Sequence, residues 1–185
     1  MLRGPLEDRK VTISRINIAI TYPCNFIFIA SMNPCPCGYY GANKRECHCK
    51  PEQIKRYINK ISGPLLDRID LHIEVESVTY EKIDKTKNIE TSEQIRKRVN
   101  QARNIQLERY KDYNAELTPR LLEKYCKLDK ECKEILEKSF NKLGLSARAY
   151  AKILKVARTI ADIDGKKDIE ISHLAEAIQY RSLDR

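Results

Sequence analysis

Four of the seven cysteines in this 185-residue chain lie in one short segment, as two close pairs: Cys35 with Cys37, and Cys47 with Cys49. Four thiolates presented from two such pairs can complete a tetrahedral Zn²⁺ site. One residue separates the partners of each pair, whereas roughly two to four is common in zinc sites. Reduced loop cysteines, or a site in which His48 replaces one thiolate, therefore stay open as alternatives. Because a four-cysteine site leaves no open coordination position, the predicted role of a metal here is structural.

Cations and aromatic rings occur in and near the same segment. Tyr39, Tyr40, Lys44 and Arg45 lie between the cysteine pairs, and Arg15 lies in an expected hairpin upstream. Aromatic rings that stack on bases, beside cations that follow phosphates, suit single-stranded nucleic acid. The competing interpretation is an exposed loop and hairpin without a ligand. A further basic run, made of Arg96, Lys97, Arg98 and Arg103, is another candidate DNA contact, but the preferred interpretation is the solvated face of a helix.

The composition indicates a globular, basic protein. Lys and Arg number 35 against 26 Asp and Glu, a net charge of +9, and 42% of the residues are hydrophobic. Such a charge suits nucleic acid or nucleotide phosphates without proving either. Six Gly and seven Pro are too few for a collagen-like or low-complexity chain. No apolar run is long enough for a spanning helix, and no secretory leader is evident, so the expected compartment is the cytoplasm, with no membrane partner.

The first part of the chain is expected to form strands, loops and one short helix. Residues 11–18 alternate apolar and polar side chains, as one arm of a hairpin would. Residues 26–30 form a short β-branched and aromatic run, typical of a strand buried on both faces. Residues 51–58 begin with Pro and predict an amphipathic helix that ends before Gly63-Pro64, and residues 69–75 return to strand alternation.

The remainder is predicted to be helical after a polar linker at residues 78–90. Helix starts are expected at capping residues, namely Thr91, Thr118, Asp129, Ser146 and Ser172, and helix ends at Gly144 and Gly165. Apolar residues at helical spacing predict the inward faces of a bundle: Ile135, Leu136, Phe140, Leu143, Tyr150, Ile153, Leu154, Ala157 and Ile160.

The two expected buried strands are too few for a sheet that is covered on both faces. Partner strands are therefore missing from the pattern. We expect residues 1–77 to be poorly stable by themselves, with weak amide protection at residues 26–30.

Six stretches of the sequence resemble one family when they are taken together: Pro5–Asp8, Val11–Arg15, Tyr22–Pro23, Ala30–Gly41, Ser62–His72 and Leu145–Tyr150. In this order they resemble the motifs of ComM/YifB-type magnesium-chelatase-like AAA+ proteins. The resemblance implies an α/β plus all-α fold: a partial AAA+ core of the P-loop type over residues 1–77, the linker, and a helical lid over residues 91–185.

Three residues match functional positions of this family. Asn33 resembles the sensor-1 residue that orients the attacking water or contacts the γ-phosphate, and its alternative role is to cap its own loop. Arg68 resembles the arginine finger that a neighbouring subunit supplies, and its alternative is a salt bridge to Asp67 or Asp70. Arg148 resembles the sensor-2 arginine of the lid, and its alternative role is a solvated charge on the helix surface. Arg158, on the same expected helix, is the poorer candidate.

The resemblance also implies cofactors and partners. They are ATP and Mg²⁺, sister subunits in a ring that is expected to be a hexamer, and single-stranded or branched DNA, in a motor for branch migration during natural transformation. No Gly-x-x-x-x-Gly-Lys-Ser/Thr motif and no strand ending in paired acids occur in the sequence, so we expect this chain to be the later part of such a machine and inactive alone. The alternatives are an ATPase subunit for Mg²⁺ insertion and a non-enzymatic, zinc-stabilised module that binds DNA or a partner.

Overall fold

The structure, a computed structural model, describes residues 2–42, 45–75 and 90–181. They divide into two compact units. The first contains residues 2–69 with 74–75, and the second contains residues 70–73 with 90–181. The predicted linker at residues 78–90 lies outside the described residues except for Glu90.

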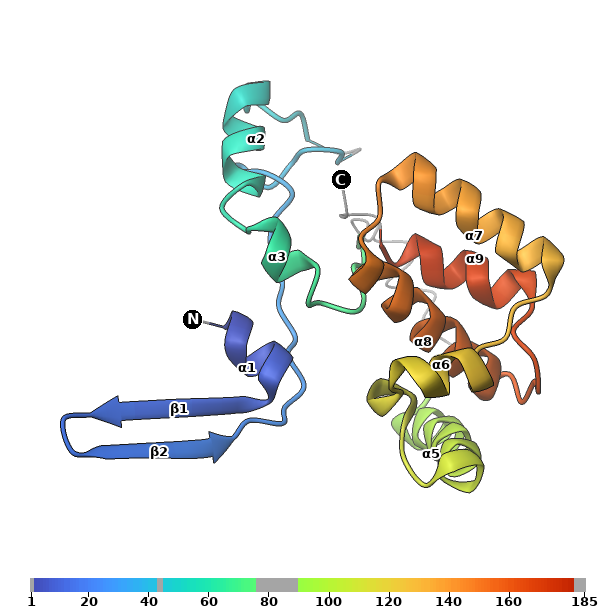
Figure 1. Ribbon diagram of the computed structural model, residues 1–185. Helices are drawn as coiled ribbons and strands as arrows, with labels where there is room; N and C mark the ends of the chain where they lie inside the picture. The colour runs from blue at the N-terminus through green and yellow to red at the C-terminus, as the bar shows by residue number, and fades with distance from the viewer. Residues whose placement is uncertain (1, 43–44, 76–89, 182–185) are drawn as a thin grey trace. The chain divides into compact units, whose positions relative to one another are not determined.

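The first unit begins with a short helix and a hairpin (Figure 1). Helix α1 (Arg3–Asp8) leads into strand β1 (Lys10–Arg15), which pairs antiparallel with β2 (Ile18–Pro23) so that Ile13 lies opposite Ile20. The predicted hairpin is confirmed, although the turn begins at Ile16, inside the stretch expected to be one strand. The sequence did not indicate α1.

Two short helices follow the cysteine segment. Helix α2 (Pro51–Ile58) has the predicted bounds, and Gln53 accepts a hydrogen bond from the backbone N–H of Lys50 at 2.9 Å to cap its start. Helix α3 (Gly63–Leu66) begins at the Gly-Pro pair, which therefore both ends the preceding segment and starts a new turn. Proline is tolerated there because the first helical N–H groups have no partner within the helix.

The prediction of two buried strands in this region is wrong. Residues 26–30 and 69–75 have no strand in the structure, and Ile27 and Ile29 are 89% and 88% exposed. Ile73 and Val75 are also exposed, at 66% and 86%. The apolar pattern is present, but no neighbouring strand in the described residues offers a hydrogen-bonding ladder, and a strand forms only with a partner.

The second unit is all helical. It contains α5 (Ser92–Tyr110), the single 3-10 turn η1 (Asn114–Glu116), α6 (Pro119–Tyr125), α7 (Lys130–Leu143), α8 (Ala147–Ile163) and α9 (Ile171–Gln179). Helix α8 packs against α9, α5, α6 and η1, and Figure 1 shows it at the centre of this group. The core consists of small and aliphatic side chains, with Ala149, Ile153, Ala157, Ala161 and Leu174 fully buried. Tyr150 is an exception to the predicted inward face, because it is 43% exposed and stacks edge-on against Phe140.

Most of the predicted helix ends are confirmed. Thr91, Asp129 and Ser146 accept hydrogen bonds from the backbone N–H three residues later, which stabilises the starts of α5, α7 and α8. Thr118 precedes α6 without a side-chain cap. The prediction for Ser172 is wrong: α9 begins one residue earlier, and Glu170 is its N-cap. Gly144 and Gly165 have φ of 60° and 68°, the left-handed conformation in which glycine ends helices.

Candidate metal centre and nucleotide-sensing residues

The four clustered cysteines converge in the first unit. Their sulfur atoms all lie within 4.8 Å of one another, with Cys35 to Cys37 at 3.3 Å, Cys35 to Cys47 at 3.7 Å and Cys37 to Cys47 at 3.6 Å. A tetrahedral Zn²⁺ with Zn–S bonds near 2.3 Å requires sulfur separations of about 3.8 Å. The donor set therefore fits a zinc ion. His48 is exposed and is not part of this group, so the alternative with a histidine ligand loses support.

The loop folds locally to bring the first pair together. Gly38, at φ 84°, donates its N–H to the carbonyl of Cys35 at 3.0 Å, and the N–H of Tyr40 points to the Cys35 sulfur at 3.4 Å. A side chain at Gly38 would be strained by this positive φ. The turn thus presents backbone N–H groups to a thiolate, an arrangement common in structural metal loops.

The thiols influence one another's protonation. Burial opposes ionisation of Cys35, but hydrogen bonds from Cys37 and from the Tyr40 N–H lower its pKa to about 6. The N–H of Cys49 favours the Cys47 thiolate, yet burial and the adjacent sulfurs raise the pKa of Cys47 to about 12. Four sulfurs this close cannot all be anionic without a cation among them, and a bound Zn²⁺ would supply the charge that makes all four thiolates.

The scattered cysteines are different. Cys126 and Cys132 are buried in the core of the second unit, and burial raises the pKa of each thiol to about 11. Both therefore act as small apolar side chains. All seven cysteines are free thiols.

Asn33, the predicted sensor residue, is exposed two residues before Cys35, the first cysteine of the cluster. Its amide lies over the Gly38 turn, since a Cβ added to Gly38 would be 3.8 Å from both Cγ and Nδ2 of Asn33. The cysteine loop therefore supports the position of this side chain from one side.

Arg68 follows α3 and is held within its own unit. Its guanidinium donates to the carbonyl of Pro64 at 2.6 Å and forms an ion pair with Glu7 of α1. Arg68 thus has a salt bridge to Glu7, a partner distant in sequence that was not among the two considered, Asp67 and Asp70. Asp70 instead pairs with Lys152 in the second unit, at 2.5 Å.

Arg148 lies exposed in the first turn of α8. Arg158, three turns along, is a different case: only 2% of its side chain is exposed. It donates to the carbonyls of Lys166 and Lys167 at 2.6 and 2.7 Å and to Asp162 at 3.1 Å. Arg158 therefore fixes the end of α8, which agrees with its lower rank as a nucleotide contact.

Asp162 is a buried charged residue that the sequence analysis did not identify. Its carboxylate is fully buried and accepts hydrogen bonds from Arg109, Arg158 and Asn114, which come from three separate elements. The i,i+4 spacing of Arg158 and Asp162, the one acidic residue of α8, was the available signal. Since every donor is accounted for, the cluster is structural.

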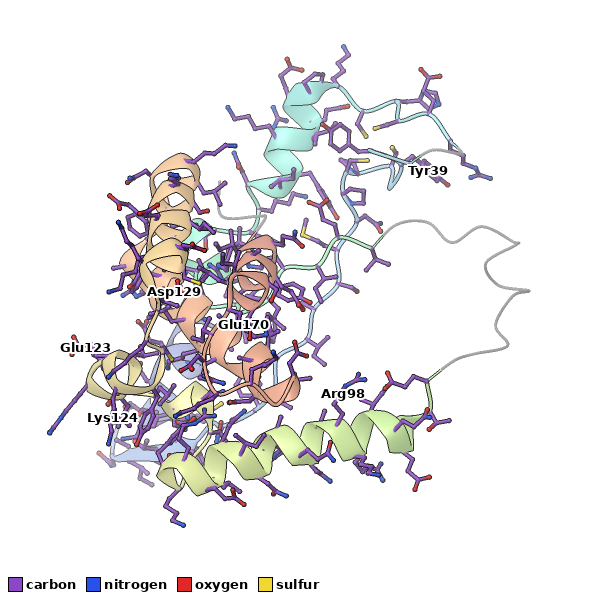
Figure 2. All side chains as sticks on the ribbon, turned by 90° about the vertical axis from the view of Figure 1, so that its right-hand side faces the viewer. Tyr39, Arg98, Glu123, Lys124, Asp129 and Glu170 are labelled. Carbon is purple, nitrogen blue, oxygen red and sulfur yellow. The ribbon has the colours of Figure 1, made fainter. Side chains whose placement is uncertain are left out.

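The predicted nucleic-acid contacts are dispersed within the first unit. Arg15 ends β1, next to the fully exposed Ile16 at the hairpin turn. Arg45 donates to the Tyr39 hydroxyl at 2.6 Å and lies 5.2 Å from the centre of that ring, while Tyr40 is 55% exposed. Figure 2 labels Tyr39 on the loop that leads into α2. Lys44 lies outside the described residues.

On α5, part of the basic run is neutralised. Arg98 pairs with Glu90 at 2.6 Å, and Arg103 donates to the Tyr113 hydroxyl at 2.7 Å. This pairing agrees with the interpretation of the run as a solvated helix face. No helix in the described part of the chain has the length and apolar content that crossing a bilayer would require.

Comparison with known families shows which family this chain belongs to. Residues 1–83 match the family described as "Magnesium chelatase, subunit ChlI", and residues 89–181 match "Magnesium chelatase, subunit ChlI C-terminal". The chain belongs to the magnesium-chelatase-like AAA+ family. The resemblance inferred from the six sequence stretches is thereby confirmed, and the two matches follow each other along the chain.

Individual relatives in this magnesium-chelatase-like family are also similar along the whole chain. It is 47% identical over 186 residues to the Competence protein ComM of Haemophilus influenzae. It is 43% identical over 185 residues to the uncharacterized protein YifB of Escherichia coli, and 32% identical to an uncharacterized protein of Mycobacterium tuberculosis. The chain spans only 36% of the length of each of these relatives.

Proposed function

We propose that this chain is the part of a ComM-like AAA+ ATPase that senses nucleotide and contacts DNA. The observation that carries the proposal is the similarity of the entire chain to the Competence protein ComM, at 47% identity. Two structural features support it: an exposed Asn33 beside the loop of clustered cysteines, and an Arg68 guanidinium that contacts α1 and α3.

In the proposed mechanism Asn33 would orient the attacking water at the γ-phosphate of ATP, and a bound Mg²⁺ would supply positive charge that offsets the charge of the phosphates. Arg68 acts on the nucleotide of the neighbouring subunit, where its planar guanidinium stabilises the charge of the transferring phosphoryl group. Arg148, exposed at the start of α8, reports nucleotide state to the helical unit. Ring assembly, with a hexamer as the proposed size, follows from a finger that acts in trans.

The proposed DNA contacts are Arg15, Tyr39, Tyr40, Lys44 and Arg45. Stacking and phosphate attraction from these side chains suit single-stranded or branched DNA, the substrate that branch migration requires. The Zn²⁺ held by the four cysteines fixes the loop that carries Tyr39 and Tyr40. The proposed setting is the cytoplasm.

The test is a chimera in which this chain replaces the matched region of the Haemophilus influenzae ComM protein. We expect ATP turnover that rises with single-stranded or branched DNA. Arg68→Ala is expected to lower kcat by about 10³-fold or more, and Arg68→Lys to recover little, because lysine cannot form the bidentate contact. Arg120→Ala, at an exposed position of α6, is the matched control. If Glu7→Gln is as harmful as Arg68→Ala, the arginine has only a structural role.

Mixing variants tests the geometry of the ring. Chimeras with Asn33→Ala alone and Arg68→Ala alone are each expected to be inactive. A mixture of the two should regain activity, because some interfaces then combine an intact Asn33 with an intact Arg68 from the neighbour. Absence of recovery in mixed oligomers refutes the trans role. Turnover that ignores DNA but responds to a porphyrin would favour the Mg²⁺-insertion alternative, and DNA affinity without any turnover would favour the zinc-stabilised binding module.

A further inference from the structure

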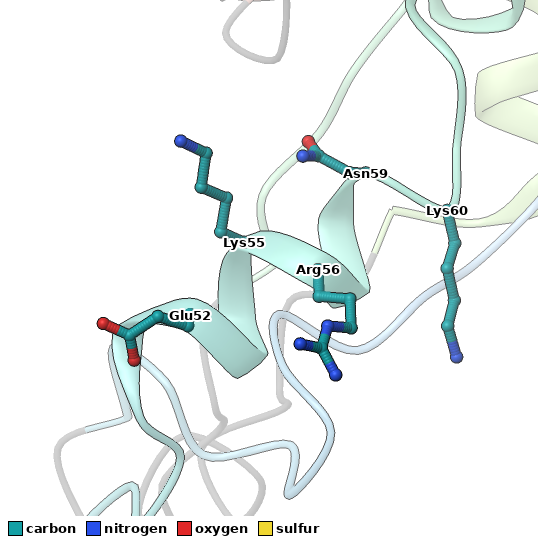
Figure 3. A pocket seen from close by; sticks show the side chains of 5 residues that line it. All are labelled: Glu52, Lys55, Arg56, Asn59 and Lys60. Atoms are coloured by element: carbon teal, nitrogen blue, oxygen red, sulfur yellow. The ribbon is translucent and has the colours of Figure 1, made fainter.

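An open basic groove, which none of the predicted contacts includes, extends from the first turn of α2 to just beyond the end of this helix. The groove is lined by Glu52, Lys55, Arg56, Asn59 and Lys60 (Figure 3). Three cationic side chains and one carboxylate give it a net charge of +2. Figure 3 shows Arg56 and Lys60 extending to one side of the helix end, whereas Lys55 and Asn59 extend to the other side.

The cations of this groove are available to a ligand. Within the described residues, the side chains of Lys55 and Arg56 are exposed and take part in no hydrogen bond or ion pair. Lys60 lies 5.8 Å from the centre of the Tyr57 ring. On α5, by contrast, Arg98 is matched by a carboxylate. A cluster of exposed cations that is not neutralised by the protein attracts anions.

Helix stability alone does not explain the cluster. Cations in the last turn of a helix interact favourably with the helix dipole, which accounts for Lys55 and Arg56. Lys60 lies beyond Asn59, the C-cap residue, where it no longer caps the helix. It nevertheless completes the groove, so a dipole effect leaves the third cation unexplained.

The surroundings favour nucleic acid over other anionic partners. A membrane-binding helix needs a large exposed apolar face, but of the apolar residues of α2 Ile54 and Tyr57 are partly buried and Ile58 alone is exposed, at 41%. Asn59 adds an amide that can donate to a phosphate, and Tyr40 offers an exposed ring on the preceding loop. Cations and rings in one small unit match a polymer of phosphates and bases.

The cysteine cluster fixes this groove to the loop. Cys49 is separated from the first residue of α2 by Lys50 alone, so a metal held by the four sulfurs anchors the start of the helix. We propose that the α2 groove, through Lys55, Arg56 and Lys60, is a second nucleic-acid contact that binds the phosphate backbone of a single strand. This inference rests on the proposed DNA function and adds a site to it.

The test measures binding of this chain to a labelled oligothymidine of about 20 nucleotides by fluorescence anisotropy, at roughly 50 and 200 mM salt. The triple variant Lys55→Gln, Arg56→Gln, Lys60→Gln removes three phosphate contacts. The slope of log K against log salt should then become shallower by about 2.1, so the ratio of variant to wild-type Kd falls about 18-fold between the two salt concentrations.

Two further variants separate the groove from general charge and from folding. The control triple variant Lys127→Gln, Lys133→Gln, Lys138→Gln removes the same charge from exposed positions in the second unit and should leave the slope unchanged. Glu52→Gln removes the only carboxylate of the groove and should raise affinity, a gain that misfolding cannot produce.

The outcomes distinguish the inference from the proposed function. Equal slopes for wild type and the α2 triple variant, or no gain from Glu52→Gln, overturn the groove even if the chimera shows DNA-stimulated turnover. Equally tight, groove-dependent binding to phosphatidylserine vesicles or polyglutamate overturns the assignment to nucleic acid. If DNA binding depends on the groove but ATP turnover by the chimera does not respond to DNA, the groove is supported as a DNA contact and the proposed DNA-dependent motor is refuted.

Discussion

Replacing Asp162 with asparagine should destabilise the helical unit severely. The substitution is nearly isosteric but removes the charge that faces Arg158 and Arg109. The Arg158 side chain is 2% exposed and cannot rehydrate, whereas Arg109 is 18% exposed and can in part. Breaking a buried pair from one side costs about 3–5 kcal/mol, because the remaining charge stays buried and uncompensated.

Urea unfolding followed by circular dichroism at the helix band measures this loss. With an m value of about 2 kcal/mol/M, the midpoint should fall by about 2 M. Asp164→Asn is the matched control, two residues along the chain: its carboxylate pairs with His173 at 3.2 Å but is 55% exposed, so about 1 kcal/mol or less should be lost. A loss below about 1 kcal/mol for Asp162→Asn, or equal losses for both variants, would refute the structural role assigned to the buried cluster.

Three other properties follow from the structure. Each chain should bind one Zn²⁺ when measured by metal analysis; Cys47→Ser should abolish tight binding, and Cys24→Ser, outside the cluster, should not. The Cys132 N–H holds the pKa of Asp129 below 3.8. The stability that this cap adds is therefore complete above pH 3.8 and is lost as the pH falls through the lower folded-state pKa. Asp129→Asn should reduce the loss of stability at acid pH in pH-dependent unfolding curves, and unchanged curves would contradict the cap. Amides of residues 26–30 should exchange without protection while those of α8 are protected, and equal protection would contradict the absence of a sheet partner.

The helices of the second unit could be predicted from the sequence because the residues that start and end them act locally. A cap such as Thr91 or Ser146 and a stop such as Gly144 depend on backbone groups within four residues, so the chain near each position decides the outcome. The convergence of the two cysteine pairs could also be predicted, since a loop of this length readily brings its ends together.

The failures arose where the outcome depends on distant partners. The run at residues 26–30 has strand composition, but β structure requires a neighbour that no local pattern can supply. The ion pair of Arg68 with Glu7 joins residues 61 positions apart, and that of Arg109 with Asp162 joins residues 53 positions apart. Both depend on how elements pack, which residue types and spacing do not encode directly.

The burial pattern indicates why a metal bound by the four cysteines would contribute strongly to the stability of the first unit. Among the described residues of that unit, Cys35 is the only one that is buried, whereas the second unit has a continuous aliphatic core. Units without a sufficient core depend on metals, disulfides or partners for stability. The free energy of zinc binding by thiolates is then folding free energy. A Zn²⁺ bound by the four cysteines would stabilise the first unit as Ile153 and Leu174 stabilise the second, and it would hold Asn33 before the cluster and α2 after it to one fixed point.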